Sequence, residues 1–164
     1  MARCKNCGES GLFKSVNALG VCARCDSIIK ITTPAQYRIY KDCCNIIENT
    51  ENPETLKKRL SLLREKLQFF LDYENKGIMI LNPYPSVLLA TLESETDDYY
   101  EKCFNKAFNS LTIKVTELKT KNSQIGKIEK FIDLVDEYKN ELTNTSTLDK
   151  WKTKAEKLLT VYST

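Results

Sequence analysis

The sequence predicts a mainly α-helical fold, in which a small N-terminal four-cysteine ribbon, built around a short β-hairpin, is joined to an α-helical bundle or hairpin. Two observations predict this fold. Two Cys-x-x-Cys motifs lie within the first 25 residues. After residue 33, apolar residues recur mainly at intervals of three and four, which is the spacing of one helix face. We therefore expect two domains, residues 1–32 and residues 33–164.

The two motifs pair Cys4 with Cys7 and Cys22 with Cys25. Thiols three residues apart can turn inward on one tight turn, and two such turns supply four sulfurs in the tetrahedral geometry that zinc accepts. The loop between the motifs has a length typical of this pattern. Because four thiolates leave no open position for water, the sequence predicts one structural zinc ion and no catalytic metal.

The cysteines are open to three other interpretations: disulfide pairs, a redox-active Cys-x-x-Cys, and unrelated thiols. Paired motifs at this spacing strongly indicate zinc, whereas a single motif is a weak indication. A thioredoxin-like motif would open a helix after a strand in a βαβ unit, and no such unit is visible. No signal peptide is visible either, so we expect a reducing compartment, where disulfides are rare.

Turn-forming residues shape the ribbon. Gly8 follows the first motif at a position that tolerates positive φ, and residues 17–20 (Asn-Ala-Leu-Gly) form a turn before the second. We expect short strands over residues 12–16 and in the segment entering Cys22. Residues 1–25 hold too few apolar side chains for a core of their own, so metal binding is expected to fold them.

Two helices are predicted next, each from an N-cap residue followed by proline. Thr33-Pro34 starts a helix that runs to about Asn49, and Asn52-Pro53 starts another that ends at Gly77. The apolar face of the second helix consists of Leu56, Leu60, Leu63, Leu67 and Phe70. Residues 78–85 then form an extended apolar linker, which is either packed against the helices or offered to a partner, with burial favoured.

The remaining chain is predicted to be helical. Heptad-like spacing from Tyr100 to Leu118 and from Ile125 to Leu142, separated at residues 120–123, predicts an antiparallel helical hairpin. A last helix, capped near Thr147, is expected to bury Trp151, Ala155, Leu158 and Tyr162. Cys43, Cys44 and Cys103 are interpreted as small buried hydrophobes, with an additional metal ligand as the alternative.

Composition excludes several classes of protein. The 164 residues carry a net charge of +3 and no histidine, which removes Cys/His zinc fingers and both Ser-His-Asp and Cys-His catalysis. The five glycines are scattered, so no phosphate-binding glycine loop is predicted. The longest apolar runs are too short to cross a bilayer. We therefore expect a soluble intracellular protein with no membrane partner.

Charge is unevenly distributed and suggests two candidate binding surfaces. The ribbon carries the cations Arg3, Lys5, Lys14 and Arg24. Residues 93–101 are acidic, with Glu93, Glu95, Asp97 and Asp98 as the candidate contact residues. A solvated helix start explains the acidic run simply, and mimicry of nucleic-acid phosphates against a basic protein groove is the sharper alternative.

The ribbon also resembles a known type of module. The residues that carry the resemblance are 3–8 (Arg-Cys-Lys-Asn-Cys-Gly) and 16–25 (Val-Asn-Ala-Leu-Gly-Val-Cys-Ala-Arg-Cys), followed by lysine-rich helices. They resemble the zinc-ribbon-plus-helix modules of Gram-positive bacteria and their phages. A free-standing chain of this size, rich in Lys, Asn and Thr, also looks like the small zinc-containing anti-CRISPR proteins of streptococcal prophages.

This resemblance implies a non-enzymatic phage inhibitor, acting in the cytoplasm of a bacterial host, that binds a type II CRISPR effector nuclease and prevents target DNA from loading. The acidic residues would then face basic regions of the nuclease. The alternative is a nucleic-acid-binding, transcription or nuclease accessory protein whose ribbon cations neutralise phosphates. The modest net charge favours the protein partner. An enzyme is not predicted, because no residues pair a nucleophile with a base.

Overall fold

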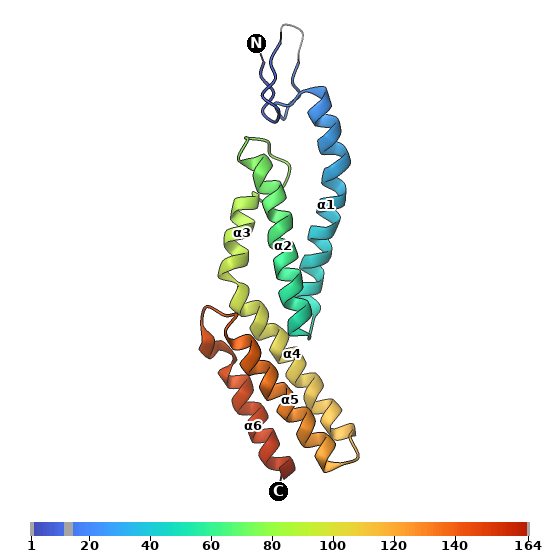
Figure 1. The fold of residues 1–164 in the computed structure, drawn as a ribbon, viewed down its shortest axis with the longest axis vertical. Helices are drawn as coiled ribbons and strands as arrows, with labels where there is room; N and C mark the ends of the chain where they lie inside the picture. The colour runs from blue at the N-terminus through green and yellow to red at the C-terminus, as the bar shows by residue number, and fades with distance from the viewer. Residues whose placement is uncertain (1, 12–14, 164) are drawn as a thin grey trace. The chain divides into compact units, whose positions relative to one another are not determined.

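The structure is a computed structural model that describes residues 2–11 and 15–163. Its elements, in chain order, are α1 (Ala23–Asn49), α2 (Pro53–Glu74), α3 (Pro85–Ser94), α4 (Thr96–Glu117), α5 (Lys121–Lys139), the 3-10 helix η1 (Thr145–Leu148) and α6 (Asp149–Ser163) (Figure 1). The predicted mainly α-helical class is confirmed.

The chain divides into two compact units. The first unit comprises Met1–Asn45 and Arg59–Glu93, and the second unit comprises Ile46–Lys58 and Ser94–Thr164. The first unit therefore contains the cysteine ribbon, most of α1 and α2, and nearly all of α3. The second unit contains α4, α5, η1 and α6, together with the connection between α1 and α2.

Helix α1 begins at Ala23 and continues through Pro34, so the predicted helix start at Thr33 is wrong. A proline inside a helix removes one backbone hydrogen bond and costs about 3 kcal/mol or more. Tertiary packing therefore has to stabilise the part of α1 that precedes it. Cys25 and Ile29, four residues apart, are both buried there. Residue 32, the predicted domain boundary, lies inside this helix, and the division at that point stays a prediction.

The predicted β-hairpin is not seen in the described part of the chain. Its first strand was expected over residues 12–16, and residues 12–14 lie outside the described residues. The other residues of the ribbon form one isolated antiparallel bridge, between Arg3 and Ser10, and no strand. Asn17 explains the turn that replaces the second strand, because its side-chain oxygen accepts the N–H groups of Leu19 (3.0 Å) and Val21 (3.2 Å).

Helix α2 confirms its predicted start at Pro53, and it ends at Glu74, three residues before the predicted Gly77. The Asn52 side chain caps it by accepting the N–H groups of Glu54 (2.9 Å) and Thr55 (3.2 Å). Gly77 adopts a φ of 68°, a left-handed conformation that ends the helical run. All members of its predicted apolar face are buried: Leu56, Leu60, Leu63, Leu67 and Phe70.

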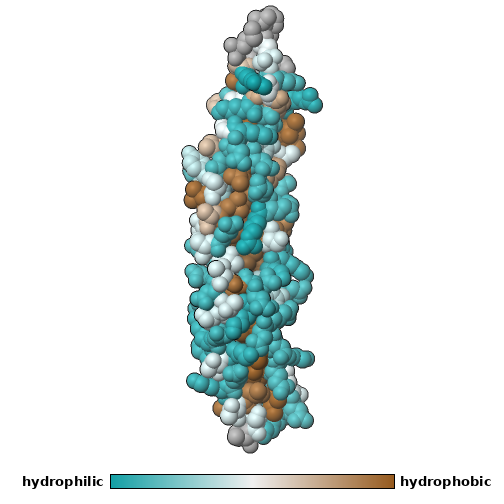
Figure 2. All heavy atoms as spheres, turned by 60° about the vertical axis from the view of Figure 1, so that its left-hand side comes forward, coloured by the Kyte–Doolittle hydropathy of each residue, from teal (hydrophilic) through white to brown (hydrophobic). Residues whose placement is uncertain are grey.

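The segment after α2 is divided between core and surface. Ile78 and Leu81 are buried, as the favoured interpretation predicted, whereas Met79 and Tyr84 are 46% and 49% exposed. The next helix begins with a side-chain cap, since the Ser86 N–H and hydroxyl both donate to the Glu74 carboxylate (2.9 and 2.6 Å). On the face drawn in Figure 2, apolar side chains form separate patches among mostly hydrophilic ones.

In the second unit, α4, α5 and α6 pack side by side (Figure 1). Aromatic rings fill the core between them: Phe104 contacts Phe131 (ring centroids 6.0 Å apart) and Tyr138 (6.4 Å). Phe131 is 6% exposed, although the heptad-like pattern predicted for this helix did not include it. The members of that pattern are Ile125, Ile128, Ile132, Val135, Tyr138 and Leu142. The predicted hairpin of α4 and α5 is confirmed, and its turn is capped by Thr120, whose hydroxyl accepts the Ser123 N–H.

The last helix buries fewer residues than predicted. Trp151 and Ala155 are buried, whereas Leu158 and Tyr162 are half-buried. It is preceded by the 3-10 helix η1, which begins two residues before the predicted cap at Thr147. The cap of η1 is Asn144, whose side chain accepts the Ser146 N–H (3.1 Å). Among the described residues, no helix has both the length and the apolar character needed to cross a membrane.

Replacing Pro34 by Ala tests whether α1 is continuous. Ala restores the missing N–H in a helix interior, so the free energy of unfolding is expected to rise by up to about 3 kcal/mol. Pro53→Ala is the matched control, because Pro53 is the first residue of α2, where proline is well tolerated. Urea titrations of both variants measure the difference. A Pro34→Ala effect no larger than the control's would contradict a helix that runs through residue 34.

Candidate metal centre

The four predicted ligands come together in the first unit. The sulfur atoms of Cys4, Cys7, Cys22 and Cys25 all lie within 4.8 Å of one another. The Sγ atoms of Cys7 and Cys22 are 3.9 Å apart. A tetrahedral zinc site with Zn–S bonds of about 2.3 Å requires sulfur separations of about 3.8 Å. The arrangement can therefore hold a metal ion with little movement of the side chains.

Backbone hydrogen bonds position the first cysteine pair. The Gly8 N–H donates to the Cys4 carbonyl (2.9 Å), which closes the turn that carries Cys7. Gly8 has a φ of 73°, the left-handed conformation that the sequence predicted for it. The Lys5 N–H donates to the Gly20 carbonyl (2.9 Å) and so joins the first turn to the segment that leads to the second pair.

The second cysteine pair lies at the start of α1. The Cys22 carbonyl accepts the Asp26 N–H (2.9 Å), a helical bond at the first turn, and the Cys22 N–H donates to the Cys4 sulfur (3.3 Å). The N-terminus of a helix carries a partial positive charge that stabilises nearby anions, including thiolates. The helix that the sequence did not predict before Thr33 therefore places its partial positive charge beside the cysteine cluster.

The cluster is part of a hydrophobic core. Three of its four cysteines are buried, and Cys7 is the exposed one. They pack with Val21, Ile29 and Ile78, the last of which is fully buried and comes from the segment after α2. Leu19, Tyr73 and Ile80 pack against the same core. The first 25 residues have too few apolar side chains for a core of their own, as predicted. Apolar side chains from residues 73–80 complete the core around the cysteines.

Two lysines connect the ribbon to the end of α2 by hydrogen bonds. The Lys5 ammonium donates to the Gly77 carbonyl (2.8 Å), and the Lys76 ammonium donates to the Asn6 side-chain oxygen (2.9 Å). Gly20, with a φ of 78°, lies beneath the Lys5 side chain, and a Cβ on Gly20 would come within 2.7 Å of the Lys5 Cε. A larger residue at position 20 would therefore displace the Lys5 side chain.

The surroundings of the thiols separate their pKa values. The backbone N–H groups of Cys7 and Cys22 stabilise the Cys4 thiolate and lower the pKa of Cys4 to about 6, against the opposing effect of burial. The Asn6 side chain lowers the pKa of Cys25, but burial and the neighbouring thiols outweigh it and raise that pKa to about 12. Cys4 is thus the thiol most readily ionised for metal binding.

The other three cysteines lie apart from this cluster. Cys43 and Cys103 are buried and Cys44 is half-buried, in agreement with the prediction of small hydrophobes. Burial raises the pKa of the Cys103 thiol to about 12, and burial also raises that of Cys43. Within the part of the chain that the structure describes, only the four ribbon cysteines form a group able to hold a metal.

The cations predicted to bind a partner have different surroundings. Lys5 is occupied by the Gly77 carbonyl, and the Arg3 Nε donates to the Gly8 carbonyl (2.9 Å). Arg24 is exposed on the first turn of α1, while Lys14 lies outside the described residues. Lys5 therefore connects the ribbon to the end of α2, and Arg3 is used within the ribbon. Their role in partner binding stays a prediction.

The predicted acidic residues are also not equivalent. Asp97 accepts the backbone N–H groups of Thr143 (3.0 Å) and Asn144 (2.8 Å), so it holds the connection that follows α5. Glu95 and Asp98 are exposed, and Glu95 accepts the Tyr99 hydroxyl (3.0 Å). Glu93 is exposed as well, but it belongs to the first unit. Among the four predicted acidic residues, Glu95 and Asp98 are the two in the second unit that are exposed to a partner.

Comparison of the chain with protein-family models, with curated proteins and with solved structures finds no match. The function is therefore inferred from the cysteine cluster and from the exposed surfaces. Sequence reasoning overlooked Asn6, Ile78 and Lys76 as supports of this cluster. The apolar run at residues 78–81 was the signal that could have indicated Ile78, whereas nothing local distinguishes Asn6 or Lys76.

Replacing Cys4 or Cys22 by Ser should abolish metal binding, because three thiolates cannot complete the site. We expect the bound metal, measured by elemental analysis, to fall from about one per chain to near zero, with most helical circular dichroism retained by the second unit. Cys103→Ala is the matched control and should keep its metal. Unchanged metal content in both serine variants would exclude the four-thiolate site.

Removing the metal with a chelator tests whether the cluster and the segment after α2 form one core. Amide hydrogen exchange should increase at residues 19–30 and at residues 73–81, since both segments pack around the sulfurs, and should change little over residues 100–140. An Ile78→Ala variant should lose about 2–5 kcal/mol of stability from the cavity it creates. Faster exchange confined to residues 1–25 would show that the ribbon folds independently.

Proposed function

We propose that this protein is a non-enzymatic, zinc-binding inhibitor that acts by binding another protein. The observation that carries the proposal is the cluster of four sulfurs within 4.8 Å of one another, three of them buried in an apolar core. Zinc is the metal proposed, because an all-thiolate tetrahedral set is typical of structural zinc. Such an ion would stabilise the fold of the first unit and would leave no coordination position for a substrate.

The proposed partner is a type II CRISPR effector nuclease, which the protein would bind so that target DNA cannot load. The resemblance of residues 3–25 to zinc ribbons of bacteria and their phages supports this proposal, as does the overall type of chain. Enzymes that hold DNA line their binding channels with cations, and exposed carboxylates complement such a channel. Glu95 and Asp98, exposed at the start of α4, are suited to this role. The inhibitor would act in the cytoplasm of a bacterial host.

A second candidate function is direct binding of nucleic acid by the ribbon. Arg24 favours it, since this side chain is exposed and no ion pair or hydrogen bond engages it in the described part of the chain. The engagement of Lys5 by the Gly77 carbonyl counts against it, because that ammonium would have to leave its partner to meet a phosphate. The net charge of +3 is also small for a nucleic-acid-binding protein.

Binding measurements with the metal-loaded protein separate the two functions. The protein is titrated against a purified type II effector complex and, separately, against generic duplex DNA over a series of salt concentrations. Stoichiometric capture of the nuclease without DNA binding is expected. Salt-sensitive binding of DNA without capture of the nuclease would favour the second candidate and overturn the first.

Charge reversal then tests the acidic residues. Glu95→Lys combined with Asp98→Lys should slow association with a basic partner about tenfold at low salt, because it removes electrostatic steering. Asp97 is left unchanged, since its carboxylate holds two backbone N–H groups. The matched control is Glu129→Lys with Asp133→Lys, two exposed carboxylates on α5. Equal association rates for the two double variants would exclude the start of α4 as the contact surface.

A further inference from the structure

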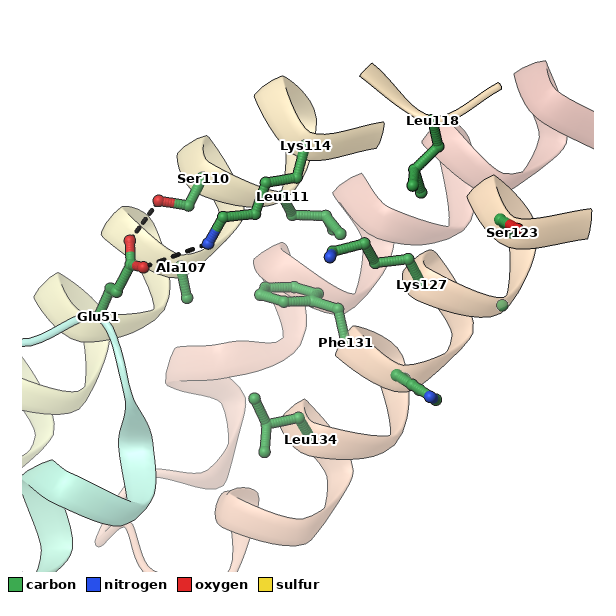
Figure 3. Close-up of a pocket in the computed structure, with 12 residues that line it drawn as sticks. Glu51, Ala107, Ser110, Leu111, Lys114, Leu118, Ser123, Lys127, Phe131 and Leu134 are labelled. Carbon is green, nitrogen blue, oxygen red and sulfur yellow. Dashed lines mark hydrogen bonds and ion pairs between the residues drawn. The ribbon is translucent and has the colours of Figure 1, made fainter. Parts of the chain in front are cut away.

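A groove in the second unit has no role in the function proposed above. It lies between α4 and α5 and has a volume of about 610 Å³. Glu51, from the connection between α1 and α2, lines one end of it (Figure 3). Its lining from α4 consists of Ala107, Ser110, Leu111, Lys114 and, just beyond the helix, Leu118. Its lining from α5 consists of Ser123, Gly126, Lys127, Lys130, Phe131 and Leu134.

The two sets of lining residues form matching stripes. Within each set the residues recur at intervals of one, three and four, which places them on one face of the helix. Residues 107–118 and 123–134 each span about 16 Å at 1.5 Å per residue. The groove therefore runs along about three turns of both helices, which is the length of a docked helical segment.

The floor of the groove is apolar. Leu111 and Phe131 lie deepest and are 5% and 6% exposed, while Leu118 and Leu134 are half-buried beside them. In Figure 3 these side chains, with Lys127, point into the space between the two helices. Half-buried leucines on a groove floor are available to apolar side chains of a partner.

Gly126 has no explanation within the chain itself. It lies inside α5, is not among the glycines with positive φ, and a Cβ built on it meets no atom within 4 Å. Glycine is less favourable than alanine inside a helix, and neither the backbone conformation nor packing within the chain requires it at this position. Its missing side chain leaves the wall of the groove open to close approach by another backbone.

The rim of the groove is positively charged. Lys114 is paired with Glu51 (3.4 Å), which also accepts a hydrogen bond from the Ser110 hydroxyl. Lys127 and Lys130 are exposed, and within residues 2–11 and 15–163 no carboxylate pairs with either of them. Two lysines one helical turn apart beside an apolar floor would complement acidic residues that flank an apolar stripe.

We propose that this groove binds an acidic amphipathic helix of a protein partner. The apolar stripe of that helix would lie on Leu111, Leu118 and Phe131, and carboxylates beside the stripe would pair with Lys127 and Lys130. Gly126 would permit the close backbone approach that helix-in-groove recognition requires. This binding activity does not depend on the inhibitor function proposed above, because it uses neither the metal nor the start of α4.

The test uses a defined probe on the full-length, metal-loaded chain. The probe is a fluorescein-labelled helical peptide of about four turns, with leucines at intervals of three and four and glutamates on both sides of them. The control peptide carries lysine in place of every glutamate. Fluorescence anisotropy should show saturable, salt-sensitive binding of the acidic peptide, at least about tenfold tighter than that of the basic peptide. Equal affinity for the two peptides, or no binding, would overturn the proposal.

Two variants locate the binding site. Gly126→Leu fills the groove at a position where a Cβ meets no atom within 4 Å and helix propensity improves, so thermal unfolding should occur at the same or a higher temperature. Binding of the acidic peptide should nevertheless weaken at least about tenfold. A folded Gly126→Leu variant with unchanged affinity would overturn the proposal.

Lys127→Glu combined with Lys130→Glu should reverse the preference between the two peptides, whereas Lys157→Glu, an exposed lysine of α6, should leave it unchanged. Preservation of the preference in the double variant would exclude the groove.

Dimerisation of the wild-type chain in sedimentation experiments, abolished by Gly126→Leu, would instead identify a second copy as the occupant and overturn the proposal. Duplex DNA that competes with the acidic peptide in these titrations would likewise overturn it.

Discussion

The packing of three of the four clustered cysteines with Ile78 in one core is the interaction on which the first unit depends. Residues 2–25 have few apolar side chains. Three of the four cysteines therefore serve as core residues themselves. Thiolates brought this close together repel one another unless a cation neutralises them. A metal ion at this point would therefore link the first residues, the start of α1 and the segment after α2 in one interaction.

The second unit is stabilised in a different way. Its core is formed by aromatic and aliphatic residues of α4, α5 and α6, among which Phe104 and Val135 are fully buried. The described part of this unit contains no group of potential metal ligands. Apolar burial of this kind needs no metal. The cores of the two units therefore differ in composition, and a metal ion held by the cysteines would act directly on the first unit alone.

Charged residues that look alike in the sequence have different tasks in the structure. Lys5 is occupied by a carbonyl and Asp97 by two backbone N–H groups, so both contribute to the fold. Glu95, Asp98, Lys127 and Lys130 extend into solvent and are available to partners. These exposed residues form two surfaces of opposite charge in the second unit. One is the acidic start of α4, and the other is the basic rim of the groove between α4 and α5.

The sequence by itself determined which four cysteines form a possible metal site, the helical class and the start of α2, because metal-ligand spacing, helix caps and the helical period are local properties. It predicted the wrong start for α1, since a proline after threonine is locally a helix start and only packing around Cys25 and Ile29 overrides that preference. The tertiary structure decided three further features: the packing of Ile78 with the cysteines, the hydrogen bond from Lys5 to Gly77, and the groove beside Gly126. Each depends on residues distant in the chain coming together, and a periodic pattern shows which face of a helix is apolar but not what covers it.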